Sequence, residues 1–402
     1  MITMHARADG LAHMLENDSS HLALRPRDSH ALRQLCHATL SATEEASAPN
    51  TQKTDDLAWE RWLWYCSNMN TPPIRDDVLA STGLDTVGAK RETILLAGFL
   101  FFLADTMPGR GGRGSAKLQS NFQMVLAVRR VHERLGARME VLHGVRKVYD
   151  SILRKFVGVN GPEALVPLRK EPLDGPRIAK LFEIPNGTVL GSKTVNWQDS
   201  YWIAWRALLS CGFAAAFRKA ELVPPQPSTA GPRDLKRASI SWIIAGTAVV
   251  NPTIDQLFSL TTGDFCVIKP PTSKADPFGL HFTSKPIFLP FGHESINAAK
   301  NIAALIVAAP VDSVLQGKVP SFCFATNGGA IFTQAETSRL LQQALKSAFP
   351  LEDTNRWSMH SLRIGAATAL LAAGASMELI QALCRWRSPK SVNIYARLGA
   401  QQ

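Results

Sequence analysis

The chain has 402 residues, of which 46% are apolar, with 27 Gly and 24 Pro. At roughly 100–200 residues per domain this is enough for two or three globular domains, and the composition excludes a collagen-like repeat and a wholly disordered chain. Lysine and arginine outnumber the acidic residues 44 to 33, which leaves a formal charge of +11 and indicates a polyanionic partner.

Cysteine and histidine usage gives no sign of a metal centre. The six cysteines are scattered without a C-x-x-C pair, and the five histidines before residue 40 include no i, i+4 pair, so we expect a reducing compartment and no metal or other cofactor. The longest apolar run, Ile94–Ala104, is too short to span a bilayer and predicts a buried helix. The first residues carry no apolar export region. We expect a protein that is not secreted and acts in the nucleus if eukaryotic, otherwise in the cytoplasm.

Two segments are predicted in the N-terminal part. Residues 1–54 lack periodicity and end in a polar stretch, which predicts a flexible leader. Residues 55–160 look helical throughout and are expected to form one domain. One predicted helix, about 115–135, ends in a cluster of basic side chains, and positions 130, 134 and 138 share one face. We expect this cluster to contact DNA phosphates, with a solvated face as the alternative. Its members are Arg129, Arg130, Arg134 and Arg138.

Residues 161–402 mix helices with short strands and are predicted to form a second domain. A helix is expected over about 200–222 and another over 295–308. Strand-like runs occur near 239–245, 265–269 and 285–290. The predicted fold class is therefore α+β, with a small antiparallel sheet among helices.

Helix ends are marked clearly in the last seventy residues. Thr333 and Glu336 fit a capping box. Gly374 is a natural helix stop, Ser376 is a natural N-cap, and Ser388-Pro389 is expected to start the last helix.

The most informative segment of the chain is His360-Ser361-Leu362-Arg363, followed by Trp386 and Tyr395. His360 and Arg363 are three positions apart, so they share a helix face and can converge on one small anion. Upstream, Arg218 comes at the end of a predicted apolar helix, and Lys274 lies in SKADPFG, the turn region of a predicted β-hairpin.

In this order and spacing the residues resemble the signature of the tyrosine recombinase (phage-integrase-like) family, Arg, Lys, His-x-x-Arg, His/Trp, Tyr. The SKADPFG stretch and the ending CRWRSPKSVNIYARL are most similar to recombinases of eukaryotic mobile elements, the DIRS-like and Crypton-like groups. The resemblance implies a helical core-binding domain before a mixed α/β catalytic domain. It also implies double-stranded DNA as partner, a tetramer on DNA, and cleavage and rejoining of DNA through a covalent 3′-phosphotyrosine.

The resemblance assigns the charge-stabilising and nucleophilic roles. Arg218 and Arg363 offer planar forks of donors to the non-bridging phosphate oxygens, which gain charge in the transition state. Tyr395 supplies the nucleophile. Trp386 donates its indole N–H to a phosphate oxygen while it packs against the site.

Proton transfer falls to two further residues. Lys274 protonates the departing 5′ oxygen and His360 helps to move the tyrosine proton. Lys285, on the following strand, and Lys269 compete with Lys274 for this role. Glu221 either orients Arg218 or has an exposed structural role. The alternative functions are a type IB topoisomerase-like nicking-closing enzyme and a catalytically inactive, domesticated DNA-binding protein.

Overall fold

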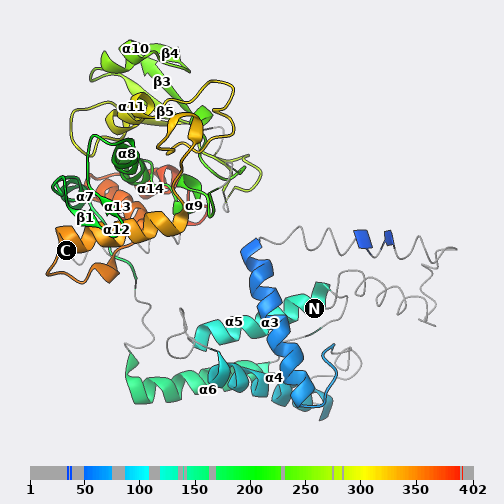
Figure 1. Cartoon of the computed structure of the whole chain (residues 1–402). Coiled ribbons are helices and arrows are strands. Elements are labelled where there is room, and N and C mark those ends of the chain that lie inside the picture. Colours follow the sequence, from blue (N-terminus) through cyan, green and yellow to red (C-terminus); the bar gives the residue numbers. More distant parts are fainter. Residues whose placement is uncertain are drawn as a thin grey trace. The chain divides into compact units, whose positions relative to one another are not determined.

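The computed structural model divides the chain into two compact units, Met1–Pro167 and Leu168–Gln402, and each is described by itself (Figure 1). The structure describes residues 34–35, 37–38, 49–74, 87–107, 118–134, 139, 143–162, 169–227, 231–273, 276–282, 285–389 and 392. Most of the predicted leader lies outside these ranges. Its last part does not fit the prediction, because a helix already begins at Pro49.

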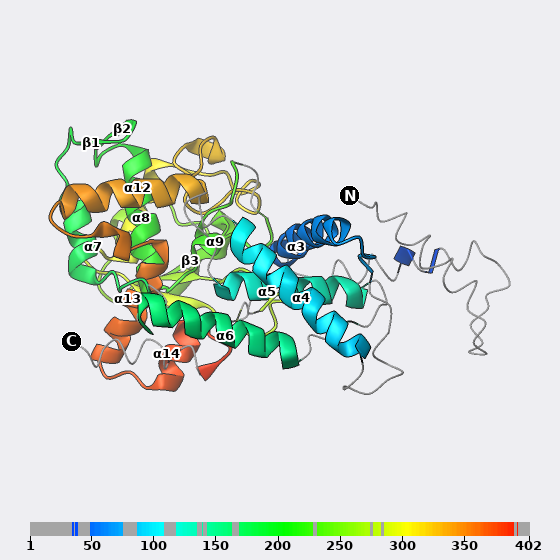
Figure 2. The ribbon, with the colours of Figure 1, turned by 90° about the horizontal axis from the view of Figure 1, so that it is seen from below.

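The described part of the N-terminal unit is built from helices α3 (Pro49–Asn68), α4 (Val87–Thr106), α5 (Leu118–Arg134) and α6 (His143–Asn160). Helix α5 packs against α3 and α4, and α4 also packs against α6 (Figure 2). The core of this unit is rich in aromatic residues, and two of them, Trp62 and Phe99, are fully buried. The apolar run predicted as a buried helix lies in α4, where Phe99 and Leu103 are buried while Ile94 is exposed. No helix among the described residues is long and apolar enough to cross a membrane.

The C-terminal unit contains the predicted antiparallel sheet, with strand order β4-β3-β5-β6. The predicted strand-like runs are β3 (Ile240–Ile244), β5 (Phe265–Ile268) and β6 (Ile287–Pro290), and the structure adds β4 (Thr247–Val249). Ala245 and Gly246 both have positive φ, so β3 and β4 are joined by a two-residue turn that matches the twist of the strands. Trp242, Cys266 and Leu289 are register partners across β3, β5 and β6, and all three are buried.

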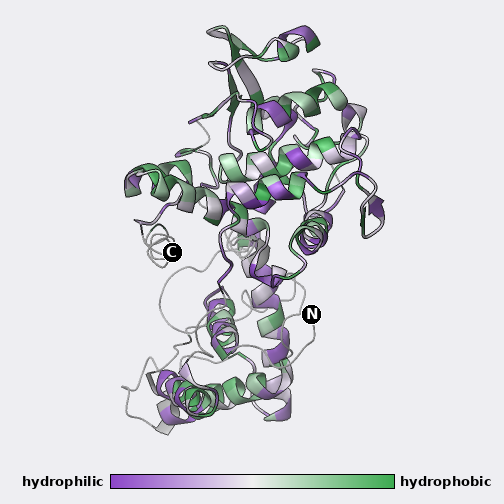
Figure 3. Cartoon of the chain, turned by 90° about the vertical axis from the view of Figure 1, so that its left-hand side faces the viewer, coloured by the Kyte–Doolittle hydropathy of each residue, from purple (hydrophilic) through white to green (hydrophobic). Residues whose placement is uncertain are grey.

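Helices form a second layer beneath this sheet. Helix α11 (Ala298–Ala308) contacts β5 and β6, and it also packs against α8 (Ser200–Ala214). Helix α8 in turn contacts α13 (Met359–Ala372), so it lies in the middle of the unit (Figure 1). Its residues are buried nearly all round, as expected for a central helix. Figure 3 shows hydrophilic residues (purple) and hydrophobic residues (green) side by side on the other helices. This is the amphipathic pattern of helices that pack around a core.

The remaining elements are short or peripheral. They are α7 (Gly175–Phe182), β1 (Val189–Leu190), β2 (Lys193–Thr194), α9 (Lys219–Leu222), α10 (Ile254–Phe258), α12 (Gln334–Ala348) and α14 (Met377–Leu383), with 3₁₀ turns at Arg237–Ser239, Thr326–Gly328 and Thr354–Arg356. The Gly374 stop and the Ser376 N-cap are confirmed, since Gly374 has φ 81 and the Ser376 side chain accepts from Leu379 N. The predicted last helix lies mainly outside the described residues.

Two local predictions were wrong. The helix expected over 200–222 is broken, because α8 ends at Ala214 and Ala216 adopts a positive φ of 49° before α9 begins. Half of the capping box at Thr333 is present, with the threonine oxygen accepting from Glu336 N. The Glu336 carboxylate instead accepts a hydrogen bond from the Tyr201 hydroxyl, at 3.1 Å.

Candidate active site

The break between α8 and α9 positions Arg218. This residue is the N-cap of α9, with extended backbone, and does not lie at the end of the long apolar helix as predicted. Its backbone N donates to Glu221 Oε2 at 2.9 Å, and its Nη1 donates to Glu221 Oε1 at 2.8 Å. Glu221 is only 4% exposed, so the exposed structural role is excluded and the carboxylate holds Arg218 at both its backbone and its side chain.

Helix α13 carries the His-x-x-Arg pair. Ser358 caps it and accepts from His360 N, and Gly365 lets the helix lie directly against the backbone of Leu173. Arg363 is buried, with 1% exposure, whereas His360 is exposed. The Arg363 guanidinium donates from Nη1 to the Ala216 carbonyl at 2.5 Å.

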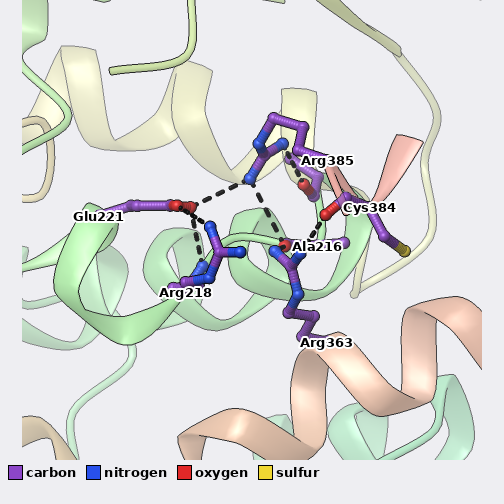
Figure 4. A network of polar contacts seen from close by, with 7 residues as sticks. Ala216, Arg218, Glu221, Arg363, Cys384 and Arg385 are labelled. Atoms are coloured by element: carbon purple, nitrogen blue, oxygen red, sulfur yellow. Dashed lines mark hydrogen bonds and ion pairs between the residues drawn. The ribbon is translucent and has the colours of Figure 1, made fainter. Parts of the chain in front are cut away.

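The segment after α14 brings a third arginine to the same place. Arg363 Nη2 donates to the Cys384 carbonyl, and the next residue, Arg385, is itself buried with 4% exposure. Arg385 Nη1 donates to the Ala215 carbonyl at 3.0 Å, and its Nη2 donates to Glu221 Oε2 at 3.0 Å (Figure 4). Sequence reasoning missed Arg385, although its place directly before Trp386 in a basic stretch was a usable signal.

Trp386 closes the apolar side of this network. It is buried, and the Arg363 guanidinium lies over its ring at 5.3 Å from the centroid. Trp386 belongs to a small apolar cluster that includes Ala216, Ile380 and Val392. The structure therefore brings Arg218, His360, Arg363 and Trp386 together, from three separate parts of the chain.

The electrostatics of this cluster favour an anion. Among the described residues the network holds the three guanidiniums of Arg218, Arg363 and Arg385 and one carboxylate, that of Glu221, which is a formal charge of +2. Burial and the like charges of Arg218 and Arg385 lower the pKa of Arg363 to about 9. A guanidinium stays protonated in proteins, so this positive charge is relieved when an anion binds rather than by loss of a proton.

The same charges act on the neighbouring acid and base. Burial would raise the pKa of Glu221, but the guanidinium of Arg385, together with the backbone N–H and the charge of Arg218, lowers it. Partial burial of the ring and the charges of Arg363 and Arg218 lower the pKa of His360 from its usual 6.5. Glu221 is therefore a carboxylate and His360 is neutral at pH 7, so the imidazole can accept a proton.

Three predicted site residues, Lys274, Tyr395 and Arg138, lie outside the described residues. Strands β5 and β6, which flank Lys274 in the sequence, are antiparallel neighbours, as expected for the two strands of a hairpin. Two positions after Lys274 in the sequence, the buried Asp276 carboxylate accepts from the backbone N of Leu280, His281 and Phe282. Its pKa is lowered because these bonds outweigh the effect of burial.

Described residues bear on the two remaining questions, which lysine is the acid and where the chain runs before Tyr395. The competing Lys285 is exposed and precedes β6 rather than lying on the strand. Lys269 is also exposed and directly follows β5. The described residue closest to Tyr395 in the chain is Val392, which packs in the same apolar cluster as Trp386.

The predicted basic face of α5 has close partners within its own unit. Arg130 Nη2 lies 2.6 Å from Asp55 Oδ1, and Arg134 Nη1 lies 3.0 Å from Asp55 Oδ2. Asp55 is fully buried on α3, so these two arginines join α3 to α5. Arg129 pairs with Glu133 at 2.8 Å on the surface. A phosphate contact by Arg130 or Arg134 would have to compete with the buried carboxylate.

Comparison with known proteins gives a match in the C-terminal part. Residues 283–402 match the sequence model of the phage integrase family. The match includes His360, Arg363, Trp386 and Tyr395, whereas Arg218 and Lys274 precede it. No group of three or more potential metal ligands occurs among the described residues.

Solved structures similar to the chain include two XerH complexes and XerA. The XerH site-specific recombinase bound to a difH substrate before cleavage has 15% identity and a TM-score of 0.46, with 98% of this chain and 93% of that chain covered. XerH bound to palindromic difH after cleavage has 15% identity and a TM-score of 0.48, with coverage of 99% and 93%. XerA recombinase has 15% identity and a TM-score of 0.32, with coverage of 89% and 92%. No curated protein sequence matches the chain.

Proposed function

We propose that this protein is a tyrosine recombinase that cuts and rejoins DNA strands site-specifically through a covalent 3′-phosphotyrosine at Tyr395. The observation that carries the proposal is the cluster of +2 formal charge around Arg218 and Arg363, beside His360 and the buried Trp386. The last three of these residues lie in the part of the chain that matches the phage integrase family.

The arrangement suits phosphoryl transfer from DNA. Arg218, whose side chain is 31% exposed, can place its guanidinium on a non-bridging oxygen while Glu221 holds it. Arg363 adds positive charge from beneath. Because a phosphodiester carries one negative charge and attack by a phenolate adds a second, donors fixed in advance lower the barrier most in the transition state.

Cleavage exchanges one phosphate ester bond for another, so it requires no redox partner. The phenolic oxygen of Tyr395 gives its proton to His360 and forms a bond to phosphorus as the bond from phosphorus to the 5′ oxygen breaks. Lys274 protonates that 5′ oxygen, and Lys285 is the alternative acid. Rejoining reverses these steps, so the energy of the phosphodiester bond is kept in the adduct.

The finer parts of the proposal rest on the sequence. SKADPFG and CRWRSPKSVNIYARL support a recombinase of the mobile-element type, DIRS-like or Crypton-like. We propose that several copies assemble on DNA, with the helices of the N-terminal unit as a core-binding domain. The site of action would be the nucleus in a eukaryote and the cytoplasm otherwise.

The test is a covalent trap. A nicked duplex whose 5′ fragment diffuses away after cleavage should leave the protein attached to a 3′ phosphate, even in excess EDTA, because the arginines carry the charge stabilisation. Tyr395→Phe keeps the ring and removes the attacking oxygen, so it should bind the duplex normally and form no adduct. Denaturing gels and peptide mapping of the adduct measure both.

The other three tyrosines, Tyr65, Tyr149 and Tyr201, serve as the internal control. Tyr201→Phe should form the adduct at the rate of the unmodified protein if it folds. An adduct mapped to any of these three, or one formed equally by Tyr395→Phe, would overturn the proposal.

A further inference from the structure

Arg385 combines two features that are unfavourable alone. It is a charged residue with 4% exposure, and its backbone has a positive φ of 51°. A residue with a side chain reaches this left-handed region only at a cost, and a buried charge needs partners. Both costs are borne at the same residue, next to the candidate active site.

The contacts of Arg385 link two parts of that site. Its guanidinium reaches the Ala215 carbonyl and Glu221 Oε2, both at 3.0 Å, and lies over the Phe217 ring at 4.4 Å. Ala216, which lies between Ala215 and Phe217, also has a positive φ, of 49°, and its carbonyl accepts from Arg363. The whole turn from Ala215 to Arg218 is thus held from one side by Arg385 (Figure 4).

We propose that Arg385 is a positioning residue that fixes Glu221 and the turn before Arg218, so that Arg218 and Arg363 are presented together to the scissile phosphate. The proposal rests on the recombinase function proposed above. Arg385 is buried by the protein and acts through the other arginines; it does not touch the DNA.

The way in which the two Glu221 carboxylate oxygens divide their hydrogen bonds explains why a second arginine is needed. Oε1 accepts from Arg218 Nη1, while Oε2 accepts from the Arg218 backbone and from Arg385. Without Arg385, the carboxylate would neutralise Arg218 alone and the turn would lose its brace. With Arg385 in place, the network keeps a formal charge of +2, which equals the charge of the dianionic transition state in magnitude.

The experiment compares two buried arginines. Arg385→Met removes the guanidinium and keeps the strained backbone and most of the volume. Arg237→Met makes the same change at an arginine of equal exposure, 4%, whose Nη2 donates to Cys323 Sγ. The readouts are duplex affinity, the rate of covalent trapping under single-turnover conditions, and the melting temperature with and without inorganic phosphate.

Arg385→Met should slow trapping about 10²-fold with unchanged duplex affinity, as expected when the geometry of oxyanion donors is lost. Arg237→Met should lower the melting temperature but leave the trapping rate of the folded protein within a few-fold. Arg385→Lys keeps the charge and loses the fork, so it should fall between Arg385→Met and the unmodified protein. Glu221→Gln should show little further loss when combined with Arg385→Met, because the two residues act as a unit.

Equal trapping rates for Arg385→Met and Arg237→Met would overturn the inference, as would a full trapping rate for Arg385→Lys should the Met variant not fold. If the unmodified protein forms no adduct, the proposed function fails instead. Phosphate then still tests the inference, since it should raise the melting temperature of the unmodified protein clearly more than that of Arg385→Lys, and an equal rise in both would overturn it.

Discussion

Each unit of this protein buries a carboxylate between two arginines, and the two clusters differ in the positive charge that they hold. In the N-terminal unit, Asp55 lies between Arg130 and Arg134 and joins two helices. In the C-terminal unit, Glu221 lies between Arg218 and Arg385, with Arg363 bonded to the same turn. Both carboxylates are nearly or fully buried.

The difference lies in where the positive charge remains. Asp55 sits at the junction of α3 and α5, and its arginines are held there by a single carboxylate. The Asp55 group has two arginines and one carboxylate, a formal charge of +1, whereas a third guanidinium raises the formal charge around Glu221 to +2. The comparison indicates that a larger excess of buried positive charge, and not a buried Arg-carboxylate pair as such, marks a functional site.

The strongest way to break the comparison is to remove one arginine of the C-terminal cluster. Arg218→Ala and Arg363→Ala should each slow covalent trapping by about 10²–10³-fold, because the first deletes donors to the developing oxyanion and the second deletes the buried positive charge behind it. Duplex affinity should change little, since most of it comes from other phosphate contacts. Single-turnover trapping and fluorescence anisotropy measure the two quantities.

Arg177→Ala is a matched control in the same unit, because Arg177 pairs with Asp174 on the surface at 2.6 Å. It should leave trapping unchanged, as surface ion pairs contribute little. A trapping rate for Arg363→Ala within threefold of the unmodified protein would contradict the assignment of the cluster as the active site.

The N-terminal cluster should respond in stability. Replacing both Arg130 and Arg134 by Met leaves the Asp55 carboxylate buried without its partners, and we expect a loss of about 3 kcal/mol in the free energy of unfolding. This is the lower end of the usual range, because the Arg130 side chain is 38% exposed. Denaturant unfolding of the full chain, followed by tryptophan fluorescence, measures it.

Adding Asp55→Asn to that double variant removes the buried charge and should restore part of the lost stability. A triple variant as unstable as the double one would show that the carboxylate is not the cause. The same variants test the predicted DNA binding by this face, because the salt slope of binding should fall by about 0.9 for every phosphate that the variant no longer neutralises. An unchanged slope in the folded double variant would mean that Arg130 and Arg134 serve only the helix junction.

Sequence patterns predicted the structural features that depend on residues close together in the chain. The alternating and apolar runs placed β3, β5 and β6, and the Gly374–Ser376 pair placed the end of α13 and the start of α14. The three-residue spacing put His360 and Arg363 on one helix. These signals are local, so they survive without knowledge of the fold.

The predictions that failed concern residues whose partners lie far away in the sequence. The break after Ala214 interrupts an apolar pattern that continues to Leu222, and it is fixed by Arg363 and Arg385, which bond the carbonyls of Ala216 and Ala215 from more than 140 positions away. The Thr333 capping box lost Glu336 to the Tyr201 hydroxyl for the same reason. Asp55, on another helix, likewise gave the basic face of α5 a partner that helix spacing alone could not reveal.

The smallest effect concerns how the C-terminal cluster responds to bound phosphate. In the free protein, partial burial and the charges of Arg363 and Arg218 lower the pKa of His360 below its usual 6.5. Acid therefore protonates His360 only below that pH, which removes the proton acceptor and adds another positive charge. The trapping rate at limiting DNA should fall about tenfold per pH unit there. A phosphate on the arginines offsets their charge, so at saturating DNA the same acid limb should move to higher pH. His360→Gln should abolish both limbs; identical limbs at limiting and saturating DNA, or limbs that persist in His360→Gln, would show that the cluster does not couple His360 to the bound phosphate.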